Sequence, residues 1–489
     1  MAKKKPRTKA PQPVRVATST PSWPTPVFVG VLAAIIATGA LLRALAAGGE
    51  LWLDEIWSFR LAQGLTSPAG VFTALHHDNN HHLNSLYLYF VHESPVWVRY
   101  RLHSLVAGVG TILLAGIIGR READQPTALA ATLLTSGSFL LTLYASEARG
   151  YALAVFFAFL AVPLAARFLV TGRVVWAAAY ALTSVLGLSS HLTFLHALLG
   201  LVVWTACRAV RHPGRWPLIW SLILLHAVPL VALALLYWID LRHVIVGGGP
   251  ILTISEVVAR IASLAVGGPE DGPWRGPAAA AAIVAGVASV IAVRRAGSDL
   301  WVLFVVAGLV APGLTLLVVD TPLLFERYFL VAAAFMTLSF GWLIALMARR
   351  SFWIAVTVAG AYVAGNGVHT MRLIESGRGN YLAALRYIEE RSTQRPATIG
   401  GDHDFRQGRL VEFYRDILGR GGDIEYHTPP EWAPAGPEWM LTHGQTSDPA
   451  PPEELIVEGG RRYRLSVVYP YGGVSGWELA VYHNALARP

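Results

Sequence analysis

Long apolar windows restrict the fold of this chain more than any other feature. Each window is about 20 residues long, the length of helix needed to cross about 30 Å of hydrocarbon. Helices and closed barrels satisfy every backbone polar group inside a bilayer, and windows this long and continuous fit helices. The sequence therefore predicts an α-helical polytopic membrane protein with about eleven transmembrane helices, in the windows 27–47, 101–119, 126–143, 151–170, 174–189, 191–207, 218–238, 277–293, 300–319, 329–347 and 352–368.

The charged residues are few, and their placement supports this count. Of 489 residues, 54% are hydrophobic and 14% charged, with a formal net charge of +8. With a cytoplasmic N-terminus, the basic clusters all fall on the cytoplasmic side. These clusters are the head, Arg120/Arg121, Arg167/Arg173, Arg208/Arg211/Arg215, Arg294/Arg295 and Arg349/Arg350. No segment clearly offers a soluble face that interleaves arginines with aromatic residues, so no nucleic acid is expected as a partner.

The chain divides into three parts by composition. Residues 1–26 form a basic cytoplasmic head, 27–369 a transmembrane domain with a first external loop at 48–100, and 370–489 an extracytoplasmic soluble domain. We expect an uncleaved anchor in the first window, although Ala44-Leu45-Ala46 resembles a signal-peptide cleavage site. The last part is expected to be a small α/β domain ending in a hairpin, with helices at 381–391 and near 409–418, strands at 463–469 and 477–482, and a Pro-rich loop at 429–452.

An acidic pair, Asp54 and Glu55, opens the first external loop among aromatic residues. Ionised carboxylates at a lipid boundary cost free energy unless a partner neutralises them or a reaction uses them. One interpretation is an interfacial helix whose acids face water. The other is a general base that takes a proton from an attacking acceptor.

The same loop continues with a histidine-rich stretch at 76–87. Four histidines, one aspartate and three asparagines can donate hydrogen bonds or bind a metal. The spacing is not specific for zinc, so a solvated polar loop is an equal interpretation. If a divalent cation binds here, with Asp78 and His81 as candidate ligands, it would counter phosphate charge or orient the acidic pair.

Two further charged clusters interrupt the apolar sequence on the same predicted face. Tyr144 to Tyr151 contains Glu147 and Arg149, which cap helix ends or pair with each other in the simplest interpretation. Phe325-Glu326-Arg327-Tyr328 forms the second cluster, for which an interfacial Glu-Arg pair is the simplest interpretation. Arginine also suits a phosphate, because it stays charged and donates two parallel hydrogen bonds.

Together these motifs resemble those of the bacterial membrane glycosyltransferases of the GT-C class, the superfamily of protein O-mannosyltransferases and the lipid A aminoarabinose transferase, with family 39 as the nearest type. Leu53-Asp54-Glu55 is similar to their Asp-Glu pair, and the 144–151 stretch to their Tyr-Ser-Gln-Glu-Ala-Arg-x-Tyr. Arg101-Leu102-His103-Ser104 resembles an Arg-Leu-Pro-Ser segment, and 325–328 a late Arg-Tyr motif. The resemblance covers roughly residues 25 to 370. In the first loop, Asn80-His81-His82-Leu83 departs from the Asn-His-Pro-Pro of many relatives, which leaves the role of His81 and any metal site open.

The resemblance implies a GT-C type fold and an inverting transfer of a sugar from a polyprenyl-phosphate donor to an envelope acceptor on the outer face. That acceptor would be a lipid, a glycan or a protein. By resemblance, Asp54 is the catalytic base with Glu55 beside it, and the donor and its phosphate are met by Arg327, Tyr328, Glu147, Arg149, Tyr144, His81 and Asn80. No cofactor is certain, and the divalent cation considered above is a candidate only. The alternatives are a transporter or lipid flippase, and a non-catalytic envelope assembly protein.

Overall fold

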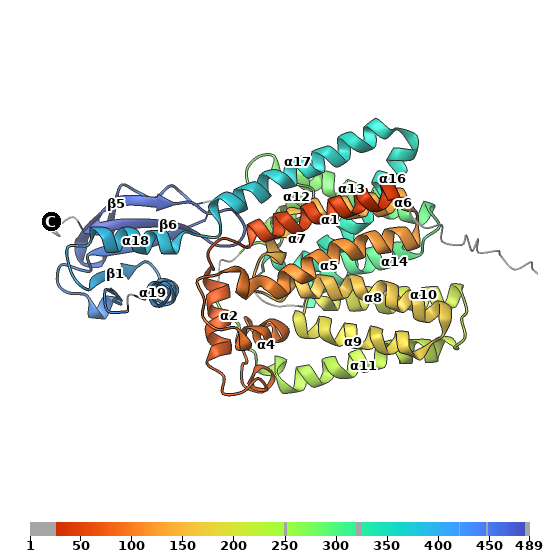
Figure 1. Ribbon diagram of the computed structural model, residues 1–489, viewed down its shortest axis with the longest axis horizontal. Helices are drawn as coiled ribbons and strands as arrows, with labels where there is room; N and C mark the ends of the chain where they lie inside the picture. Colours follow the sequence, from red (N-terminus) through yellow and green to blue (C-terminus); the bar gives the residue numbers. More distant parts are fainter. Residues whose placement is uncertain (1–25, 249–251, 319–323, 420, 446–447, 485–489) are drawn as a thin grey trace, which may run out of the picture.

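The protein consists of a helical bundle with a small α/β domain at one end (Figure 1). The computed structural model describes residues 26–248, 252–318, 324–419, 421–445 and 448–484. The predicted basic head, apart from Pro26, lies outside the described residues. Figure 1 places the start of the first helix and the α/β domain at opposite ends of the long axis.

Each of the eleven predicted windows contains a helix, which confirms the helical class. Eight of these helices are long and apolar enough to cross a membrane, when the short turn Glu326–Phe329 is counted with the helix that follows it. The number is nine if the bent pair Gln125–Gly137 and Phe139–Ala145 forms one span. Of the other two, Val174–Ser190 has 17 residues, and Phe352–Ser376 is a 25-residue helix outside that set. The helices are α1 (Pro26–Ala46), α5 (Val98–Glu122), α6 (Gln125–Gly137) with α7 (Phe139–Ala145), α8 (Tyr151–Thr171), α9 (Val174–Ser190), α10 (Phe194–Arg211), α11 (Leu218–Ile239), α13 (Arg275–Arg295), α14 (Leu300–Val305) with η2 (Val306–Val310) and α15 (Ala311–Val318), α16 (Leu330–Arg350) after η3 (Glu326–Phe329), and α17 (Phe352–Ser376).

The span formed by α6 and α7 is bent by 59° at Ser138. A bend removes helical hydrogen bonds, and lipid offers no water to replace them. Other helices supply the missing partners. Asn366 of α17 accepts the Phe139 backbone N–H at 2.8 Å. Arg43 of α1 donates to the Thr135 and Ser136 carbonyl oxygens at 3.0 and 3.1 Å.

The loop between α1 and α5 folds into three helices: α2 (Leu53–Gln63), α3 (Gly70–Thr73) and α4 (His82–Phe90). Helix α2 runs across the end of the bundle, between the bundle and the α/β domain (Figure 1). A second connection at this end of the bundle, between α11 and α13, contains η1 (Leu241–His243) and α12 (Ile254–Ala265). It meets the first loop where the Asp78 backbone N–H donates to the Ile245 carbonyl oxygen at 3.0 Å.

The C-terminal domain is a six-stranded mixed sheet with two helices. Its elements are α18 (Tyr381–Arg391), β1 (Ala397–Gly401), α19 (Asp404–Leu418), β2 (Ile424–Tyr426), η4 (Pro429–Glu431), β3 (Trp439–Gly444), β4 (Glu454–Val457), η5 (Glu458–Gly460), β5 (Arg461–Tyr469) and β6 (Glu478–Asn484). The strand order is β2-β1-β3-β6-β5-β4, with β1 parallel to both of its neighbours and the other pairs antiparallel.

The prediction for this domain was right in outline and wrong in one segment, and it did not include β1, β2 and β4. The α/β class and the final antiparallel pair, β5 with β6, are confirmed. The predicted Pro-rich loop at 429–452 instead contains β3, an inner strand. Its residues Trp439, Met440 and Leu441 are buried, and they pair with both β1 and β6.

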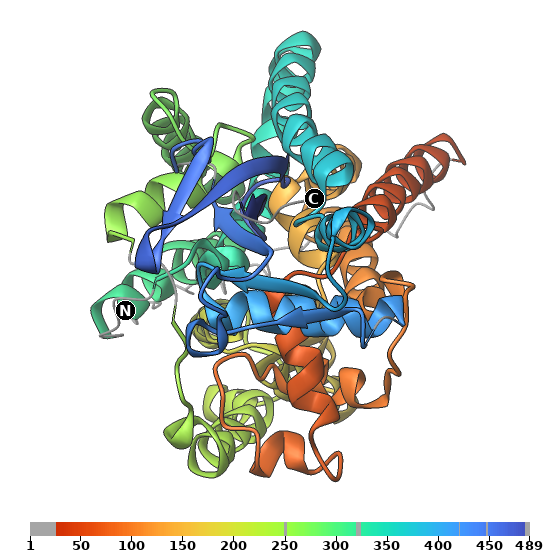
Figure 2. The same cartoon turned by 90° about the vertical axis from the view of Figure 1, so that its left-hand side faces the viewer.

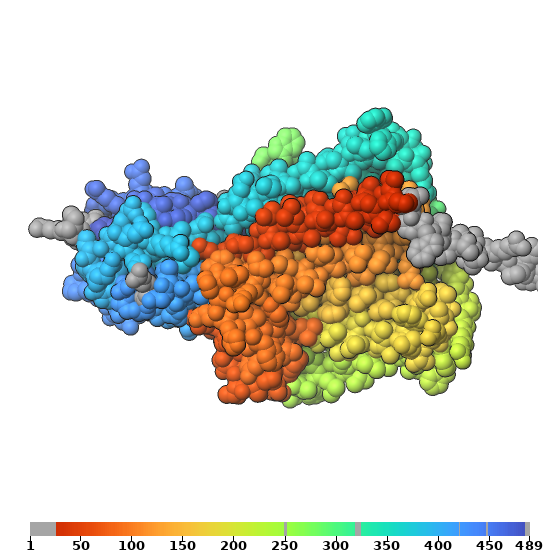
Figure 3. Space-filling view, viewed as in Figure 1, coloured from red at the N-terminus to blue at the C-terminus, as the bar shows by residue number. Residues whose placement is uncertain are grey.

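The C-terminal domain shares its main core with the loop between α1 and α5. Leu51, Ile56 and Phe59 pack in one cluster with residues of α18, α19 and the sheet, such as Leu385 and Phe413. Figure 2, which views the molecule from this end, shows the domain lying across the end of the bundle, and Figure 3 shows the two surfaces in close contact. Burial of apolar area on both sides therefore docks the domain over the loop that carries the acidic pair.

Candidate functional site

Asp54 is the meeting point of three segments that are distant in sequence. One of its carboxylate oxygens, Oδ2, lies 2.7 Å from Nη1 of Arg149 and 3.1 Å from Nη1 of Arg327. Asp54 and Arg327 are 273 residues apart in the chain. The Asp54 and Arg327 side chains are 20% and 21% exposed, whereas Arg149 is 3% exposed. The site is therefore a carboxylate in contact with two arginines, of which Arg327 reaches solvent.

Local hydrogen bonds fix the position of Asp54 at the start of α2. Its backbone carbonyl oxygen accepts from Ser58 Oγ at 2.8 Å and from Asn79 Nδ2 at 2.9 Å. Asn79 also donates to Ser58 Oγ at 3.0 Å, so the histidine-rich loop is tied to the first turn of α2. The first turn of a helix also favours a negative side chain, because the backbone N–H groups there carry partial positive charge.

Glu55 turns away from Asp54 into the protein interior. Arg101 of α5 binds both of its carboxylate oxygens, and the Ala148 backbone N–H donates to it at 2.7 Å. Burial alone would raise the pKa of Glu55, but the Arg101 guanidinium holds it below its usual value. Arg101 also donates to the carbonyl oxygens of Ala47 and Glu50, each at 2.9 Å. Glu55 thus closes the turn between α1 and α2.

Glu147 and Arg149 do not pair with each other, although their spacing allowed it. Glu147 accepts from Nε of Arg378 at 3.3 Å, and both side chains are buried. Burial raises the pKa of Glu147, and the Arg378 charge only partly offsets this. Arg378 also donates to Leu143 O and Ser146 Oγ at 2.9 Å. The pair therefore joins the charged link after α7 to the start of the C-terminal domain.

The two charges of the late motif also have separate partners. Glu326 accepts from Arg260 of α12 at 3.0 Å, which leaves Arg327 to contact Asp54. The Arg327 guanidinium lies 4.3 Å from the centre of the Phe325 ring. An aromatic face favours a cation without consuming its hydrogen-bond donors, so Arg327 keeps donors for a further partner.

Aromatic and imidazole rings form one wall beside the arginines. The His81 ring lies 4.6 Å from His191 and 5.1 Å from Tyr151. Tyr144 packs 5.1 Å from Tyr151, and Tyr328 stacks 6.5 Å from His191. His81 and Tyr144 are buried, and Tyr328 is partly buried. The structure thus brings His81, Tyr144 and Tyr328 around the same ring cluster.

His81 is held as a neutral imidazole. Its Nδ1 accepts the Gly150 backbone N–H at 2.9 Å. Burial, followed by the charge of Arg149, lowers the pKa of His81 well below its usual value. A Cβ at Gly150 would lie 1.9 Å from the Ser190 carbonyl oxygen, so only glycine fits there. His81 therefore links the histidine-rich loop to the segment that carries Arg149.

The side chains of Asn80 and Asp78 contact other residues of their own loop. The Asn80 amide donates to the carbonyl oxygens of Val71 and Leu75 at 2.8 and 2.7 Å. Asp78 lies 2.8 Å from His77, whose hydrogen bond lowers the pKa of Asp78 although burial acts the other way. Within the described ranges, no group of three or more His, Cys, Asp or Glu side chains is arranged to hold a metal ion. The side chains in contact with Asp54 are the cations Arg149 and Arg327, so the surroundings of Asp54 do not fit a divalent ion.

The C-terminal domain contributes residues beside Asp54 that the sequence did not point to. Trp477 lies 5.5 Å from Trp52, and the Arg406 guanidinium lies 4.4 Å from the Trp477 ring. Burial lowers the pKa of Arg406, and the carboxylates of Asp402 and Asp54 act in the opposite direction. Arg101 and Arg378 are the other functional residues absent from the predicted set. Arg101 could have been found from its motif, whereas Arg378, between two glycines, carried no signal.

The arrangement has the parts required for group transfer with acid–base help. Asp54 is a partly exposed carboxylate whose second oxygen, Oδ1, is not used by either arginine contact. Arg327 offers charge to an incoming anion, and rings surround both. A carboxylate within reach of an acceptor can take its proton as a general base.

Comparison with known proteins gives matches at the level of structure. No family model matches the sequence, and no curated protein matches it. The structure is similar to the Archaeoglobus fulgidus oligosaccharyltransferase in its apo form, with 12% identity, 84% of this chain and 65% of that chain covered, and a TM-score of 0.48. The form tethered with an acceptor peptide containing the NVT sequon gives 13% identity, 84% and 65% coverage and a TM-score of 0.46.

A third match is the archaeal oligosaccharyltransferase AglB from Archaeoglobus fulgidus in complex with an inhibitory peptide and a dolichol-phosphate. It shows 12% identity, 85% and 69% coverage and a TM-score of 0.44. The chain thus spans 65% of the length of the first of these solved chains. At these identities and scores the likeness does not extend to an activity or to the role of any residue.

Proposed function

We propose that this protein is a membrane glycosyltransferase that moves a sugar from a polyprenyl-phosphate donor to an envelope acceptor. The observation that supports this most directly is the contact of Asp54 with both Arg149 and Arg327. A proton acceptor and a partly exposed cation then lie within one site, next to a bundle of apolar helices. A lipid-linked donor needs this combination, because its chain stays in the bilayer while its phosphate must meet positive charge at the boundary.

Asp54 is the general base in this proposal. It takes the proton from the acceptor hydroxyl or amine while that atom attacks the anomeric carbon. The bond from the anomeric carbon to the phosphate oxygen breaks, and its electron pair leaves with the phosphate. Direct attack on the face opposite the leaving group inverts the anomeric centre.

Arg327 is the residue assigned to the donor phosphate. It is the more exposed of the two arginines, and its guanidinium has donors beyond the one directed at Asp54. When an anionic donor enters, Arg327 can turn part of its guanidinium to the phosphate and stabilise the charge that builds up on the leaving group. Movement of one arginine away from Asp54 would also open the carboxylate to the acceptor.

Arg149 has a different task because it is buried. At 2.7 Å from Asp54, it holds the carboxylate in place. Glu55, Glu147, His81 and Asn80 act as positioning residues in this proposal, because each is engaged with another part of the protein. Tyr144 and Tyr328 line the ring cluster beside the donor.

The C-terminal domain is proposed to face the acceptor. Arg406 and Trp477 lie on the side of Asp54 away from the bundle, and the domain is docked by a continuous apolar core. The positions of the basic clusters favour a cytoplasmic N-terminus. With that orientation, the site and the C-terminal domain lie on the extracytoplasmic face.

The decisive experiment replaces Asp54 by asparagine and follows sugar transfer. Purified wild-type protein should release polyprenyl phosphate from a labelled polyprenyl-phosphate sugar when envelope extract is the acceptor. The Asp54→Asn protein should be slower by about 10²–10⁴-fold, because asparagine cannot take the proton. Wild-type activity in that variant would remove Asp54 from the mechanism.

A matched control keeps this result from reflecting a damaged fold. Asp416 is an external carboxylate that also binds an arginine, with 2.8 Å to Arg60. The Asp416→Asn protein should transfer sugar at the wild-type rate. Equal loss in both variants would point to folding rather than to chemistry.

A further inference from the structure

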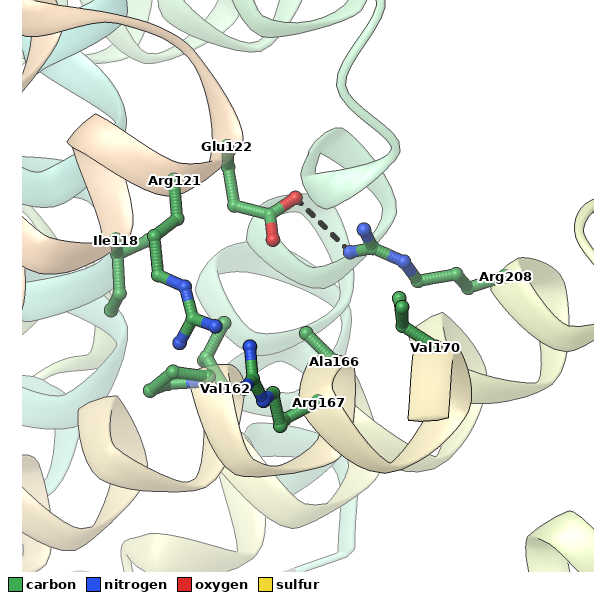
Figure 4. Close-up of a pocket in the computed structure, with 9 residues that line it drawn as sticks. Ile118, Arg121, Glu122, Val162, Ala166, Arg167, Val170 and Arg208 are labelled. Atoms are coloured by element: carbon green, nitrogen blue, oxygen red, sulfur yellow. Dashed lines mark hydrogen bonds and ion pairs between the residues drawn. The ribbon is translucent and has the colours of Figure 1, made fainter. Parts of the chain in front are cut away.

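A cavity of about 200 Å³, shown in Figure 4, opens at the end of the bundle opposite the α/β domain, where α5, α8 and α10 end (Figure 1). It lies between the last turns of α5 and α8 and the end of α10. The proposed transfer reaction makes no use of this end of the protein. Three arginines, Arg121, Arg167 and Arg208, line the cavity together with the single acidic residue Glu122.

The positive charge of the cavity is only partly neutralised. Glu122 pairs with Arg208 at 3.0 Å, and Asp299 lies 3.4 Å from the same Arg208 nitrogen. Arg121 and Arg167 have no acidic partner among the described residues. In Figure 4 both of their side chains extend toward the space between α5 and α8. Two like charges directed into one space repel each other unless an anion lies between them.

The rest of the lining is apolar. Small or compact side chains on α8 leave the volume unfilled, since Val162, Pro163 and Ala166 face Ile118 of α5. Val170, at the last turn of α8, is 76% exposed beside this opening. A cavity with apolar walls and two cations near its rim suits a molecule with a hydrocarbon part and an anionic part.

We infer that this cavity binds the phosphate headgroup of an anionic membrane lipid. The headgroup phosphate lies between Arg121 and Arg167, and the start of an acyl chain follows the apolar wall of α8. Basic pockets between transmembrane helices are known to suit such headgroups, and each arginine near the membrane surface adds to the attraction. The cavity is a second lipid site, separate from the one proposed for the donor.

Arginines at helix ends also serve to orient membrane proteins, so the test must separate the two roles. Arg295 and Arg350 lie at the ends of α13 and α16, are exposed, and do not line the cavity. Replacing them removes the same charge as replacing Arg121 and Arg167. A general effect of surface charge would therefore be equal in the two double variants.

The experiment titrates the full-length protein in neutral detergent with phosphatidylglycerol, phosphatidylcholine or inorganic phosphate, and follows retained lipid by native mass spectrometry and stabilisation by thermal unfolding. Phosphatidylglycerol should bind the wild type in a saturable manner. The double variant Arg121→Gln/Arg167→Gln should bind it roughly tenfold more weakly. The double variant Arg295→Gln/Arg350→Gln should match the wild type.

A third variant keeps every charge and fills the space. Ala166→Leu places a larger side chain in the cavity and should also lose binding. Equal weakening in the two double variants, or tight binding by Ala166→Leu, would overturn the site. Equal binding of phosphatidylcholine, or displacement of the lipid by inorganic phosphate at the same concentration, would overturn the anionic-lipid assignment.

Discussion

Glu55 and Arg101 form a buried two-pronged ion pair, with the Arg101 Nε 2.7 Å from Glu55 Oε1 and the Nη2 bound to Oε2. Neither side chain reaches solvent. Asp54, the preceding residue, is partly exposed and faces two other arginines. Adjacent residues in the first turn of a helix point in different directions, so the two acids have separate partners and separate tasks.

Removal of the Glu55 charge should damage the fold rather than the chemistry. Glu55→Gln leaves Arg101 as a buried cation without a counter-charge, which costs about 3–5 kcal/mol. We expect a lower thermal unfolding midpoint and less monodisperse protein, with transfer per folded molecule reduced far less than in Asp54→Asn. A Glu55→Gln protein of normal stability but without activity would instead make Glu55 a catalytic residue.

Replacement of the two arginines at Asp54 should give different results. Arg327→Gln should lower kcat/KM for the labelled donor by about 10²-fold, because the variant lacks the cation that stabilises the leaving phosphate. Its thermal unfolding midpoint should stay near that of the wild type. Arg149→Gln should lower both kcat/KM and the thermal midpoint, since its partner Asp54 loses a buried counter-charge. Arg409→Gln, an exposed change on the same side, is the control and should alter neither quantity.

Glu50 should make docking of the C-terminal domain sensitive to pH. Burial raises the pKa of Glu50 from 4.5 to about 7, and its carboxylate accepts the Leu382 backbone N–H at 2.8 Å. The folded protein then binds a proton more tightly than the unfolded chain. This contribution to stability is complete below about pH 4.5 and is lost as the pH rises to about 7.

The measurement is the thermal midpoint of the wild type and of Glu50→Gln between pH 4.5 and 8. The difference between the two proteins should change across this range and level off above pH 7. Glu390, which is 71% exposed, provides the control Glu390→Gln, whose pH profile should follow the wild type. A constant difference between wild type and Glu50→Gln would contradict the assignment.

Arg378 should control the attachment of the C-terminal domain. Arg378→Met leaves Glu147 buried without its cation and removes donors from Leu143 O and Ser146 Oγ. The buried unpaired charge costs about 3–5 kcal/mol. Limited proteolysis should release a fragment that begins near residue 377 much faster than from the wild type. Arg372→Gln, an exposed change in the last turns of α17, should not accelerate cleavage.

The helical bundle could be predicted from the sequence because the bilayer imposes a simple rule. Every apolar window of spanning length must form a helix, and the windows at 27–47 and 218–238 became α1 and α11 with ends within a few residues. The bend at Ser138 was missed, since its cause is a set of partners from α1 and α17. Strand β3 was missed because it is short and lies among prolines.

The site was predictable only in part. Motifs supplied Asp54, Arg149 and Arg327, yet their contact depends on how α2, the link after α7 and η3 meet in space. The late motif shows the limit of spacing. Spacing left open a pair between Glu326 and Arg327, whereas in the structure Arg260 from α12 binds Glu326 at 3.0 Å. Pairing across the fold outweighed pairing along the chain, which spacing cannot reveal.

The bend between α6 and α7 has a consequence for biogenesis. Arg43 of α1 supplies the donors for Thr135 O and Ser136 O, carbonyl groups that lipid would leave without partners. The two spans are therefore not independent insertion events. Helix α1 precedes the bent pair in the chain, whereas α17, whose Asn366 accepts the Phe139 backbone N–H, follows it. The bent pair therefore stays energetically incomplete until α17 packs beside it, and so does the assembly of the adjoining segment that carries Arg149.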